Sequence, residues 1–422
     1  MSQLVKGLVE EKQSRVKETM KIMGLSDFVY NAAWFTIAGC QWLLSSALCT
    51  LVVWGLLLDH TDGSIVFVYF VVFSMSEIAL CFLLAALFNR ALLAAILAPI
   101  ALLALAMLRF IVWSTPTWEL IWAKWLLSII APSAFVFGGD SIASFEAMSL
   151  GMGWDEVDVG PFPFSASLIM MVVDALIYFV LAWYLDKVLP KTFGVQYPAC
   201  FPCSRQFWKN YCFNLRDHLQ NVNTDATQSV DDEGGPAVSR AVVISHLRKI
   251  FRVRGHTPCS HEDKVAVADL SLEAYKDQIT VLLGHNGAGK STTMSILAGL
   301  ISATAGDCEI QGLSISRDMP RIRTFLGMCP QHNVLFPKLT VNDHLRFFAV
   351  LKRAVPTKSK NNVDPVALVV DSALREVGLF EKKGAIATTL SGGQKRKLSL
   401  AIALLGNSSV VFLDEPTSGM DP

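Results

Sequence analysis

Four apolar runs divide the first half of the chain, and each is about as long as a membrane-spanning helix. They cover residues 34–58, 65–88, 91–113 and 165–185. Polar residues separate them, such as Asp59 and Asp62 after the first run and Asp186 after the fourth. About 20 consecutive apolar residues suffice for a helix to cross the hydrocarbon core of a bilayer. The pattern therefore predicts a membrane domain over residues 34–189 with four transmembrane helices.

A different pattern precedes the first run. Within residues 10–24, Val16, Met20, Met23 and Ile22 recur at helical spacing, with charged residues on the other side. This spacing predicts an amphipathic helix within residues 1–33. A charged, solvated helix is one interpretation. The position just before a transmembrane run favours a helix that lies at the membrane surface or docks on another domain.

The second half of the chain changes character. We interpret residues 190–240 as a cytoplasmic linker, because the part from 217 to 240 is polar and rich in Asn, Asp, Ser, Thr and Gly. From residue 241 to 422, strand-like and helix-like runs alternate. The predicted fold class is therefore a multi-domain chain, with an α-helical polytopic membrane domain followed by an α/β domain.

The α/β domain opens with a glycine-rich phosphate-binding pattern. The apolar run 279–283 predicts a strand, and residues 293–298 predict a helix. Between them stands the pattern G-x-x-x-x-G-K-[ST], which in this context is a P-loop rather than a chance glycine-rich turn. It is formed by Gly284, His285, Asn286, Gly287, Ala288, Gly289, Lys290, Ser291 and Thr292. We expect Lys290 to contact the β- and γ-phosphates of a nucleoside triphosphate and Ser291 to hold Mg²⁺.

Further motifs follow in order, and their combination is more specific than any one of them. Phe251, upstream, could stack on adenine or be a core residue. Gln331, after a Met-Cys-Pro run, could reach Mg²⁺ and water. Ser391, Gly392, Gly393 and Gln394 open a predicted helix and offer a second anion site. The apolar strand 410–413 ends at Asp414, which suits Mg²⁺, and Glu415, which suits the attacking water.

Composition agrees with a membrane ATPase. Hydrophobic residues make up 52% of the chain and its mean hydropathy is +0.44, which is too apolar for an ordinary soluble NTPase. The 36 basic and 36 acidic residues balance, so no nucleic-acid partner is indicated. Cys200 and Cys203, with Cys212 nearby, could bind metal or be acylated, but ordinary free thiols are favoured.

Charge distribution predicts the topology. Lysines and an arginine precede residue 34, whereas residues 138–164 carry acids and neither Lys nor Arg. Because ATP is cytoplasmic, the α/β domain requires an even number of crossings. We therefore interpret residues 119–150, which Lys124 and Pro132 interrupt, as a non-crossing helical hairpin on the far side.

Glu77 and Asp174 lie deep inside predicted spans. Such residues can contact a substrate headgroup or bind a proton. A buried, hydrogen-bonded anchor or a protonated acid without function is the favoured interpretation for both.

Several motifs together resemble the ATPase domains of ABC transporters. They are GHNGAGKST, PQH, LSGGQ, VVFLDEP and SGMD, which correspond to the Walker A, Q-loop, signature, Walker B and D-loop motifs. The wider text, including ITVLLGHNGAGKSTT and EEKQSRVKETMKIMGL, is similar to the amino-terminal half of the A-subfamily, the lipid exporters. The resemblance covers nearly the whole chain.

The resemblance implies roles for particular residues. Lys290, Ser291 and Thr292 would hold phosphate and Mg²⁺, and Gln331 would couple the site to the membrane domain. Ser391, Gly392 and Gly393 would contact ATP bound to a second nucleotide-binding domain. Asp414 would bind Mg²⁺ and Glu415 would be the catalytic base. Residues 10–24 would be a coupling helix, and 119–150 an extracellular hairpin.

The resemblance also implies partners and a location. We expect an ATP-driven lipid translocase in a membrane (plasma membrane, endolysosomal or another vesicle), with the ATP-binding domain cytoplasmic. A second membrane domain, a second ATP-binding domain and a switch histidine after Walker B are expected elsewhere, because the last histidine here is His344. Alternatives are an exporter of another hydrophobic cargo, or a truncated product that binds ATP without hydrolysis and regulates a partner.

Overall fold

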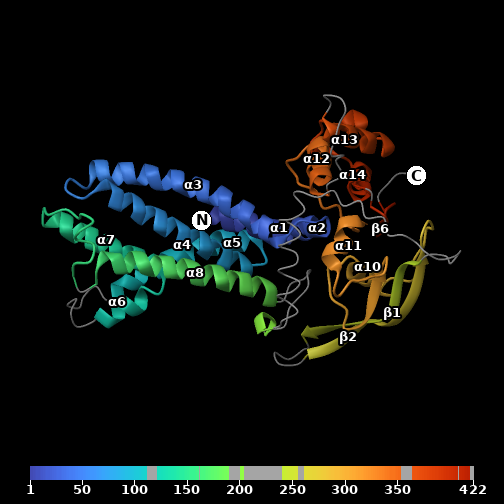
Figure 1. The fold of residues 1–422 in the computed structure, drawn as a ribbon, viewed down its shortest axis with the longest axis horizontal. Coiled ribbons are helices and arrows are strands. Elements are labelled where there is room, and N and C mark those ends of the chain that lie inside the picture. The colour runs from blue at the N-terminus through green and yellow to red at the C-terminus, as the bar shows by residue number, and fades with distance from the viewer. Residues whose placement is uncertain are drawn as a thin grey trace. The chain divides into compact units, whose positions relative to one another are not determined.

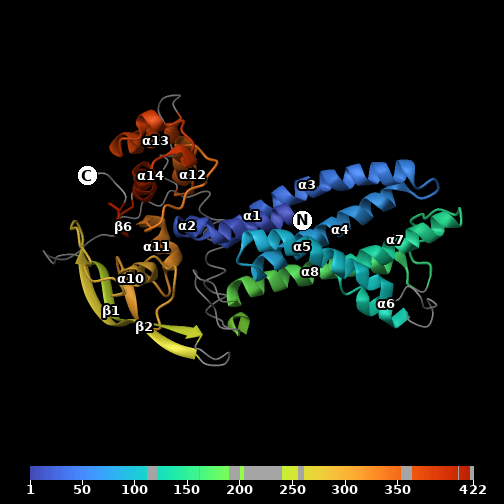
Figure 2. The same ribbon diagram turned by 180° about the vertical axis from the view of Figure 1, so that it is seen from behind.

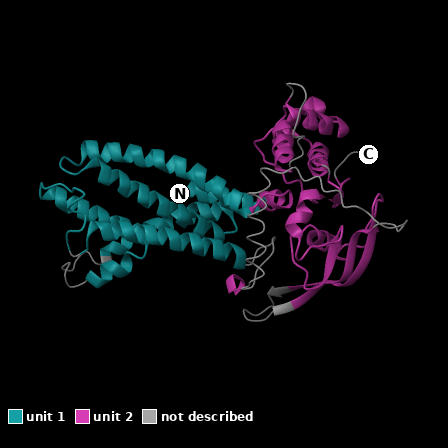
Figure 3. Cartoon of the chain, in the orientation of Figure 1, with its two compact units in different colours: residues 1–14, 27–189 teal, residues 15–26, 190–422 magenta. Residues whose placement is uncertain are grey.

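The computed structural model describes residues 1–111, 121–160, 162–189, 200–203, 240–254, 261–352, 364–406 and 408–418. Most of the predicted linker, Cys212, the first two residues of the predicted hairpin and the SGMD end lie outside these ranges. The chain forms two compact units (Figure 3). The membrane unit comprises residues 1–14 and 27–189, and the nucleotide unit comprises residues 15–26 and 190–422.

In the described part of the membrane unit, helices joined by loops are the regular secondary structure (Figures 1 and 2). Its helices are α1 (Ser2–Gln13), α3 (Asp27–Leu56), α4 (Gly63–Leu87), α5 (Ala91–Ala106), α6 (Ile121–Leu127), α7 (Ala131–Ala147) and α8 (Phe164–Val188), with the 3₁₀ turn η1 (Met107–Ile111) after α5. Four helices are long and apolar enough to cross a membrane, and they match the four predicted spans: α3, α4, α5 extended to Phe110, and α8.

The predicted hairpin forms two helices that are not among these candidates. At about 1.5 Å per residue, α6 is roughly 10 Å long, far too short to span. Helix α7 runs along α8, with the Ala131 N–H donating to the Tyr178 hydroxyl and Ser167 Oγ donating to the Ala134 carbonyl. The re-entrant character of this segment and its side of the membrane both stay predictions.

The loop between α3 and α4 is bound to the last turn of α7. Glu146 accepts hydrogen bonds from the backbone N–H groups of Asp59 and His60 and from the Thr61 hydroxyl. These bonds lower the pKa of the Glu146 carboxyl, the Thr61 hydroxyl contributing most. These bonds therefore fix the α3–α4 loop to α7, the second helix of the predicted hairpin.

The predicted amphipathic helix over 10–24 is two helices in the structure. Helix α1 ends at Gln13, and α2 (Val16–Ile22) starts after Arg15, which adopts a left-handed conformation with φ 63°. A β-carbon disfavours this conformation, so it marks a break that a periodic pattern cannot predict. Helix α1 belongs to the membrane unit, where Lys12 Nζ donates to the last carbonyls of α4, those of Ala86 and Phe88.

Helix α2 belongs to the nucleotide unit and is docked there. Ile22 enters a core built from β-strands and α10, and Met23 enters a second core of helices. Val16 and Met20 are buried as well. Of the two alternatives for this segment, docking on another domain therefore fits its second half.

The nucleotide unit contains two sheets and a group of helices. A four-stranded antiparallel sheet has the order β2-β1-β3-β4, and β5 pairs with β6 in parallel. The strands are β1 (Arg240–Arg254), β2 (His261–Tyr275), β3 (Ala305–Ile310), β4 (Leu313–Ser314), β5 (Leu326–Cys329) and β6 (Val410–Leu413). The α-helices besides α2 are α10 (Lys290–Leu297), α11 (Met319–Phe325), α12 (Val341–Leu351), α13 (Pro365–Glu376) and α14 (Gly392–Leu404), and the 3₁₀ turns are η2 (Phe201–Cys203), η3 (Phe380–Lys382) and η4 (Ala387–Thr389).

One core joins the elements that carry the predicted site. Ile296 and Leu297 of α10 pack in the same cluster as Met328 of β5 and Val410 and Phe412 of β6. The helix that follows the phosphate loop therefore lies on the two strands whose carboxyl ends carry Gln331, Asp414 and Glu415. Function at the carboxyl ends of parallel strands is the common arrangement in α/β folds.

Candidate functional site

The phosphate loop is formed without the strand that the sequence predicts before it. Residues 279–283 are not in a strand; Ile279 is 95% exposed and Leu283 is 85% exposed. A β-rich apolar run becomes a strand only where a neighbouring strand offers hydrogen-bond partners. In the described sheet β5 and β6 pair with each other, so the prediction of a strand over 279–283 is wrong for this structure.

The loop itself and its helix follow the prediction. Gly287 and Gly289 have φ values of 87° and 89°, which favour glycine, and Gly289 is the residue before α10. A β-carbon on Gly289 would lie 2.4 Å from the Ala266 carbonyl oxygen of β2, so no side chain fits there. The loop can therefore turn tightly into the amino end of α10, where backbone N–H groups favour an anion.

Lys290 is the charged side chain of this loop. Its Nζ donates to the carbonyl oxygens of Gly284, at 2.5 Å, and His285, at 2.9 Å. The ammonium is thus folded over the loop that is predicted to bind phosphate. Ser291 is exposed at the first turn of α10.

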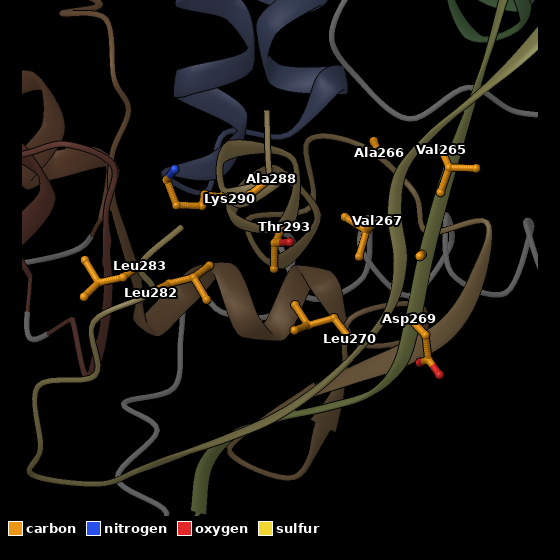
Figure 4. A pocket seen from close by; sticks show the side chains of 11 residues that line it. Val265, Ala266, Val267, Asp269, Leu270, Leu282, Leu283, Ala288, Lys290 and Thr293 are labelled. Atoms are coloured by element: carbon orange, nitrogen blue, oxygen red, sulfur yellow. The ribbon is translucent and has the colours of Figure 1, made fainter. Parts of the chain in front are cut away.

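A cavity of about 380 Å³ lies beside the loop (Figure 4). Residues 265–270 of β2 line it, together with Leu282, Leu283, Ala288, Lys290 and Thr293. Figure 4 shows Val267 and Leu270 on the side of β2 that faces α10. Phe251 is not among the lining residues; it lies on β1 opposite Lys264, 37% exposed, with Lys249 Nζ 5.0 Å from the centre of its ring. Adenine stacking by Phe251 stays a prediction.

Gln331 and Glu415 meet in the structure. Gln331 Nε2 donates to Glu415 Oε2 at 3.1 Å, although the two residues are 84 positions apart. Parallel pairing of β5 with β6, continued by the Asp414 N–H donating to the Cys329 carbonyl, brings the strand ends together. Glu415 has φ 49°, an uncommon conformation for a residue with a β-carbon. Two residues chosen from separate motifs are therefore neighbours.

The residues predicted to bind metal have side chains that suit Mg²⁺. Ser291, Gln331 and Asp414 offer oxygen donors, which Mg²⁺ prefers, and few of them are carboxylates. Within the part of the chain that the structure describes, no group of three or more His, Cys, Asp and Glu residues could hold a metal ion. Mg²⁺ is normally bound by one or two carboxylates together with substrate phosphates, so such a cage is not required.

The signature segment begins α14 with a capping box. Ser391 Oγ accepts from the Gln394 N–H at 3.3 Å, and Gln394 Oε1 accepts from the Ser391 N–H at 3.1 Å. The side chain of Gln394 therefore caps the helix. The N–H groups of Gly392 and Gly393 have no intrahelical partner by their position in the first turn, and they stay available for an anion.

Replacing Ser391 with alanine is expected to lower the free energy of unfolding by about 1 kcal/mol, because the capping bond is lost. Thermal unfolding followed by circular dichroism measures the change. Ser302→Ala, at an exposed position, is the matched control. A variant as stable as this control would contradict the role of the cap.

Arg396 is a site residue that the sequence interpretation missed. Its side chain is only 1% exposed, and its guanidinium donates to five backbone carbonyls. They belong to Pro330, Gln331, Asp414, Glu415 and Pro416. In the sequence Arg396 lies between Lys395 and Lys397, and this run of positive charges indicates an exposed surface position. The signal that could have found it is its helical spacing to Ser399 and Ala403, which are also buried.

The cysteines and His344 are the remaining residues that the sequence analysis considered. The cysteines that the structure describes are free, Cys200 and Cys203 among them. His344 is buried in α12, where its Nε2 accepts from the Phe336 N–H and its Nδ1 lies 2.8 Å from the Thr340 carbonyl. Its burial lowers its pKa. His344 therefore has a structural position.

Comparison with known proteins connects both units to one family. Residues 1–184 match the family described as ABC-2 family transporter protein, and residues 267–418 match the family described as ABC transporter. Human retinal-specific phospholipid-transporting ATPase ABCA4 is 36% identical over 443 residues, which cover 100% of this chain and 19% of that protein. Rat ATP-binding cassette sub-family A member 7 is 36% identical over 99% of this chain and 19% of its own length. Human phospholipid-transporting ATPase ABCA3 is 35% identical over 99% of this chain and 25% of its own length.

The chain therefore spans about a fifth to a quarter of the length of these relatives. A helical membrane domain precedes a domain in which one core carries the phosphate loop and the strands of the Gln–Glu pair, and a second core carries the capped signature helix. On these matches and this architecture, the chain belongs to the ABC transporters, with members of the A-subfamily as its relatives over its whole length.

Proposed function

We propose that this chain is part of a transporter that uses ATP hydrolysis to move lipids, or similar amphipathic molecules, across or out of a membrane. The contact between Gln331 and Glu415 carries the catalytic part of the proposal, because it joins a carboxylate and an amide beside the Walker B strand. The printed names of two relatives, phospholipid-transporting ATPases, support the lipid class.

In this proposal Glu415 acts as the general base for the water that attacks the γ-phosphate. Gln331 orients the carboxylate and the water, and Lys290 compensates negative charge on the β- and γ-phosphates. Mg²⁺, held by Ser291, Asp414 and Gln331, would supply Lewis-acid stabilisation of the phosphate oxygens.

The signature residues act on a partner. Ser391, Gly392 and Gly393 would contact ATP bound to a second nucleotide-binding domain, as the free amides at the start of α14 allow. A second membrane domain would complete the transport path. We place the nucleotide unit in the cytoplasm, where ATP is available.

Helix α2 would transmit the effect of ATP. Its residues Ile22 and Met23 pack into both cores of the nucleotide unit, and the adjoining α1 belongs to the membrane unit. A rearrangement of either core would therefore move the segment that leads into the membrane domain. Residues 10–24 would in this way couple the two units.

Replacing Lys290 with alanine tests the nucleotide site. The variant should bind Mg-ATP about 10–100-fold more weakly, because one charge-assisted hydrogen bond to phosphate contributes roughly 1.5–3 kcal/mol. Binding is measured with a fluorescent ATP analogue displaced by ATP. Lys276→Ala, an exposed lysine in the same unit, is the control. Equal affinities in both variants would refute the assignment of the loop.

A further inference from the structure

Two carboxyl groups are buried in the membrane unit, and neither has been assigned a role. Glu77 in α4 is 3% exposed and Asp174 in α8 is 1% exposed. Glu77 Oε1 and Asp174 Oδ2 are fully enclosed and have no hydrogen-bond partner among the residues that the structure describes. Of the two interpretations favoured from the sequence, the hydrogen-bonded anchor does not hold for these two oxygens, and the protonated acid stays a prediction.

The two groups lie at nearly the same depth of two packed helices. Helices α4 and α8 are parallel neighbours, because the tilted rings of Tyr69 and Phe164 have centres 5.4 Å apart and, further along, Leu80 and Ala182 belong to one apolar cluster. Glu77 is eight residues beyond Tyr69, about 12 Å along the helix, and Asp174 is ten beyond Phe164, about 15 Å.

Apolar clusters lie before and after the two carboxyls along the helix pair α4 and α8. Toward the start of α4 and α8, Phe73 and Met171 belong to one cluster, and toward their ends, Leu83 and Ala182 belong to another. Water is therefore separated from the carboxyls along the helix pair by packed side chains. Helical spacing puts Asp174 on the face of α8 that carries Met171 and Tyr178, with Ser76 and Glu77 at the corresponding level of α4.

An ionised carboxylate in such surroundings is unfavourable by several kcal/mol or more unless a cation or water compensates it. A neutral carboxyl needs neither. The closed packing of α4 against α8 is therefore compatible with the protonated form, and ionisation would require water to enter between the helices.

We propose that Glu77 and Asp174 form a proton-binding site whose bound proton stabilises the closed packing of α4 against α8. Release breaks a carboxyl O–H bond, leaves the electron pair on the carboxylate and transfers the proton to water that enters as the helices separate. Because the closed form holds more protons than the open form, raising the pH favours the open form. The burial of these two carboxyls supports a proton-binding site whatever molecule the transporter moves, and whether or not it hydrolyses ATP.

Few other ionisable groups face the pair. They are the α-amino group of Met1 and the Cys81 thiol, which interact with Glu77, and the Tyr178 phenol, which interacts with Asp174. On the other elements packed against α4 and α8, Asp140 of α7 is paired with Arg109, Glu146 is bound to the α3–α4 loop, and Cys40 and Cys49 of α3 are exposed. On α1, which also packs against α4, Lys12 donates to the carbonyls of Ala86 and Phe88, and Glu11 accepts from Tyr30 and Trp34.

Labelling tests for the proton directly. The full chain in phosphatidylcholine vesicles is treated with dicyclohexylcarbodiimide at a series of pH values, and modified residues are identified by mass spectrometry. This apolar reagent takes the carboxyl proton onto nitrogen while the carboxylate adds to its central carbon, so it selects protonated, buried acids. We expect Glu77 or Asp174 to be modified at acidic pH and progressively less as the pH rises.

Cross-linking tests the coupling to packing. A disulfide is formed between α4 and α8 in the Leu80→Cys, Ala182→Cys chain, and its yield is divided by the yield in the same chain carrying Glu77→Gln and Asp174→Asn. This division cancels the effect of pH on thiol chemistry. The ratio should fall by up to about tenfold per pH unit for one released proton. Asp155→Asn with Asp158→Asn, at exposed positions, is the control and should leave the pH dependence unchanged.

The single variants Glu77→Gln and Asp174→Asn replace the double variant if it does not fold, and the labelling needs no variant. A ratio that stays constant across the pH range overturns the proposal. Labelling that spares both residues at every pH also overturns it.

Discussion

Replacing Glu415 with glutamine in the ATP-hydrolysing transporter is expected to lower ATP turnover by about 10²–10⁴-fold, the contribution of a positioned general base. The amide oxygen of glutamine can still accept the hydrogen bond that Gln331 Nε2 donates to Glu415 Oε2. The geometry of the pair should therefore persist while the base is lost. Steady-state phosphate release, measured beside ATP binding, separates the two effects, because binding should change little.

The control for this experiment is Glu381→Gln, which removes a carboxylate from an exposed 3₁₀ turn of the same unit. It should retain normal turnover. Gln331→Leu provides a second comparison, because it keeps the base and removes the group that orients it. Normal turnover in Glu415→Gln would show that another group activates the water.

The hydrophobic pattern predicted the membrane unit well because a spanning helix satisfies its own backbone hydrogen bonds. The runs 34–58 and 65–88 therefore needed no information about neighbours to be identified as α3 and α4. The same local character explains the correct prediction of α10 and α14, which begin at a glycine-rich loop and at a capping serine.

Predictions that depend on partners far away in the sequence were less successful. The run 279–283 has the composition of a strand, but pairing determines whether it forms one. The break at Arg15 follows from the docking of Ile22 and Met23 on a unit whose other residues begin at 190. Glu77 and Asp174 were recognised as unusual, yet only packing reveals that one oxygen of each has no hydrogen-bond partner in the described part of the chain.

The role of Arg396 could not be predicted from the sequence, because its hydrogen-bond partners lie far away in the chain. Its replacement should have the largest effect on the free energy of unfolding. Its carbonyl partners lie on two segments, residues 330–331 after β5 and residues 414–416 after β6. The planar guanidinium has five N–H donors, and all five are used. The residue therefore holds together the two strand ends from which the side chains of Gln331 and Glu415 meet.

Replacing Arg396 with methionine leaves buried carbonyls without donors. One such group costs about 1–3 kcal/mol, and the effects of neighbours do not simply add, so we expect a loss of at least about 3 kcal/mol in the free energy of unfolding. Arg396→Lys should recover little of it, because an ammonium has three donors at one point and cannot span both segments. ATP turnover should fall with stability, as Gln331 and Glu415 are no longer held in contact.

Lys397→Met is the matched control, since Lys397 is the next residue of α14, carries the same charge and is exposed. Thermal unfolding and ATP turnover of the three variants form one comparison. The fixed geometry of the guanidinium predicts that the methionine and lysine variants of Arg396 resemble each other and differ from Lys397→Met. If Arg396→Lys instead behaved like the wild type, a single positive charge near Asp414 and Glu415 would suffice, and the five-donor arrangement would not be what holds the two strand ends together.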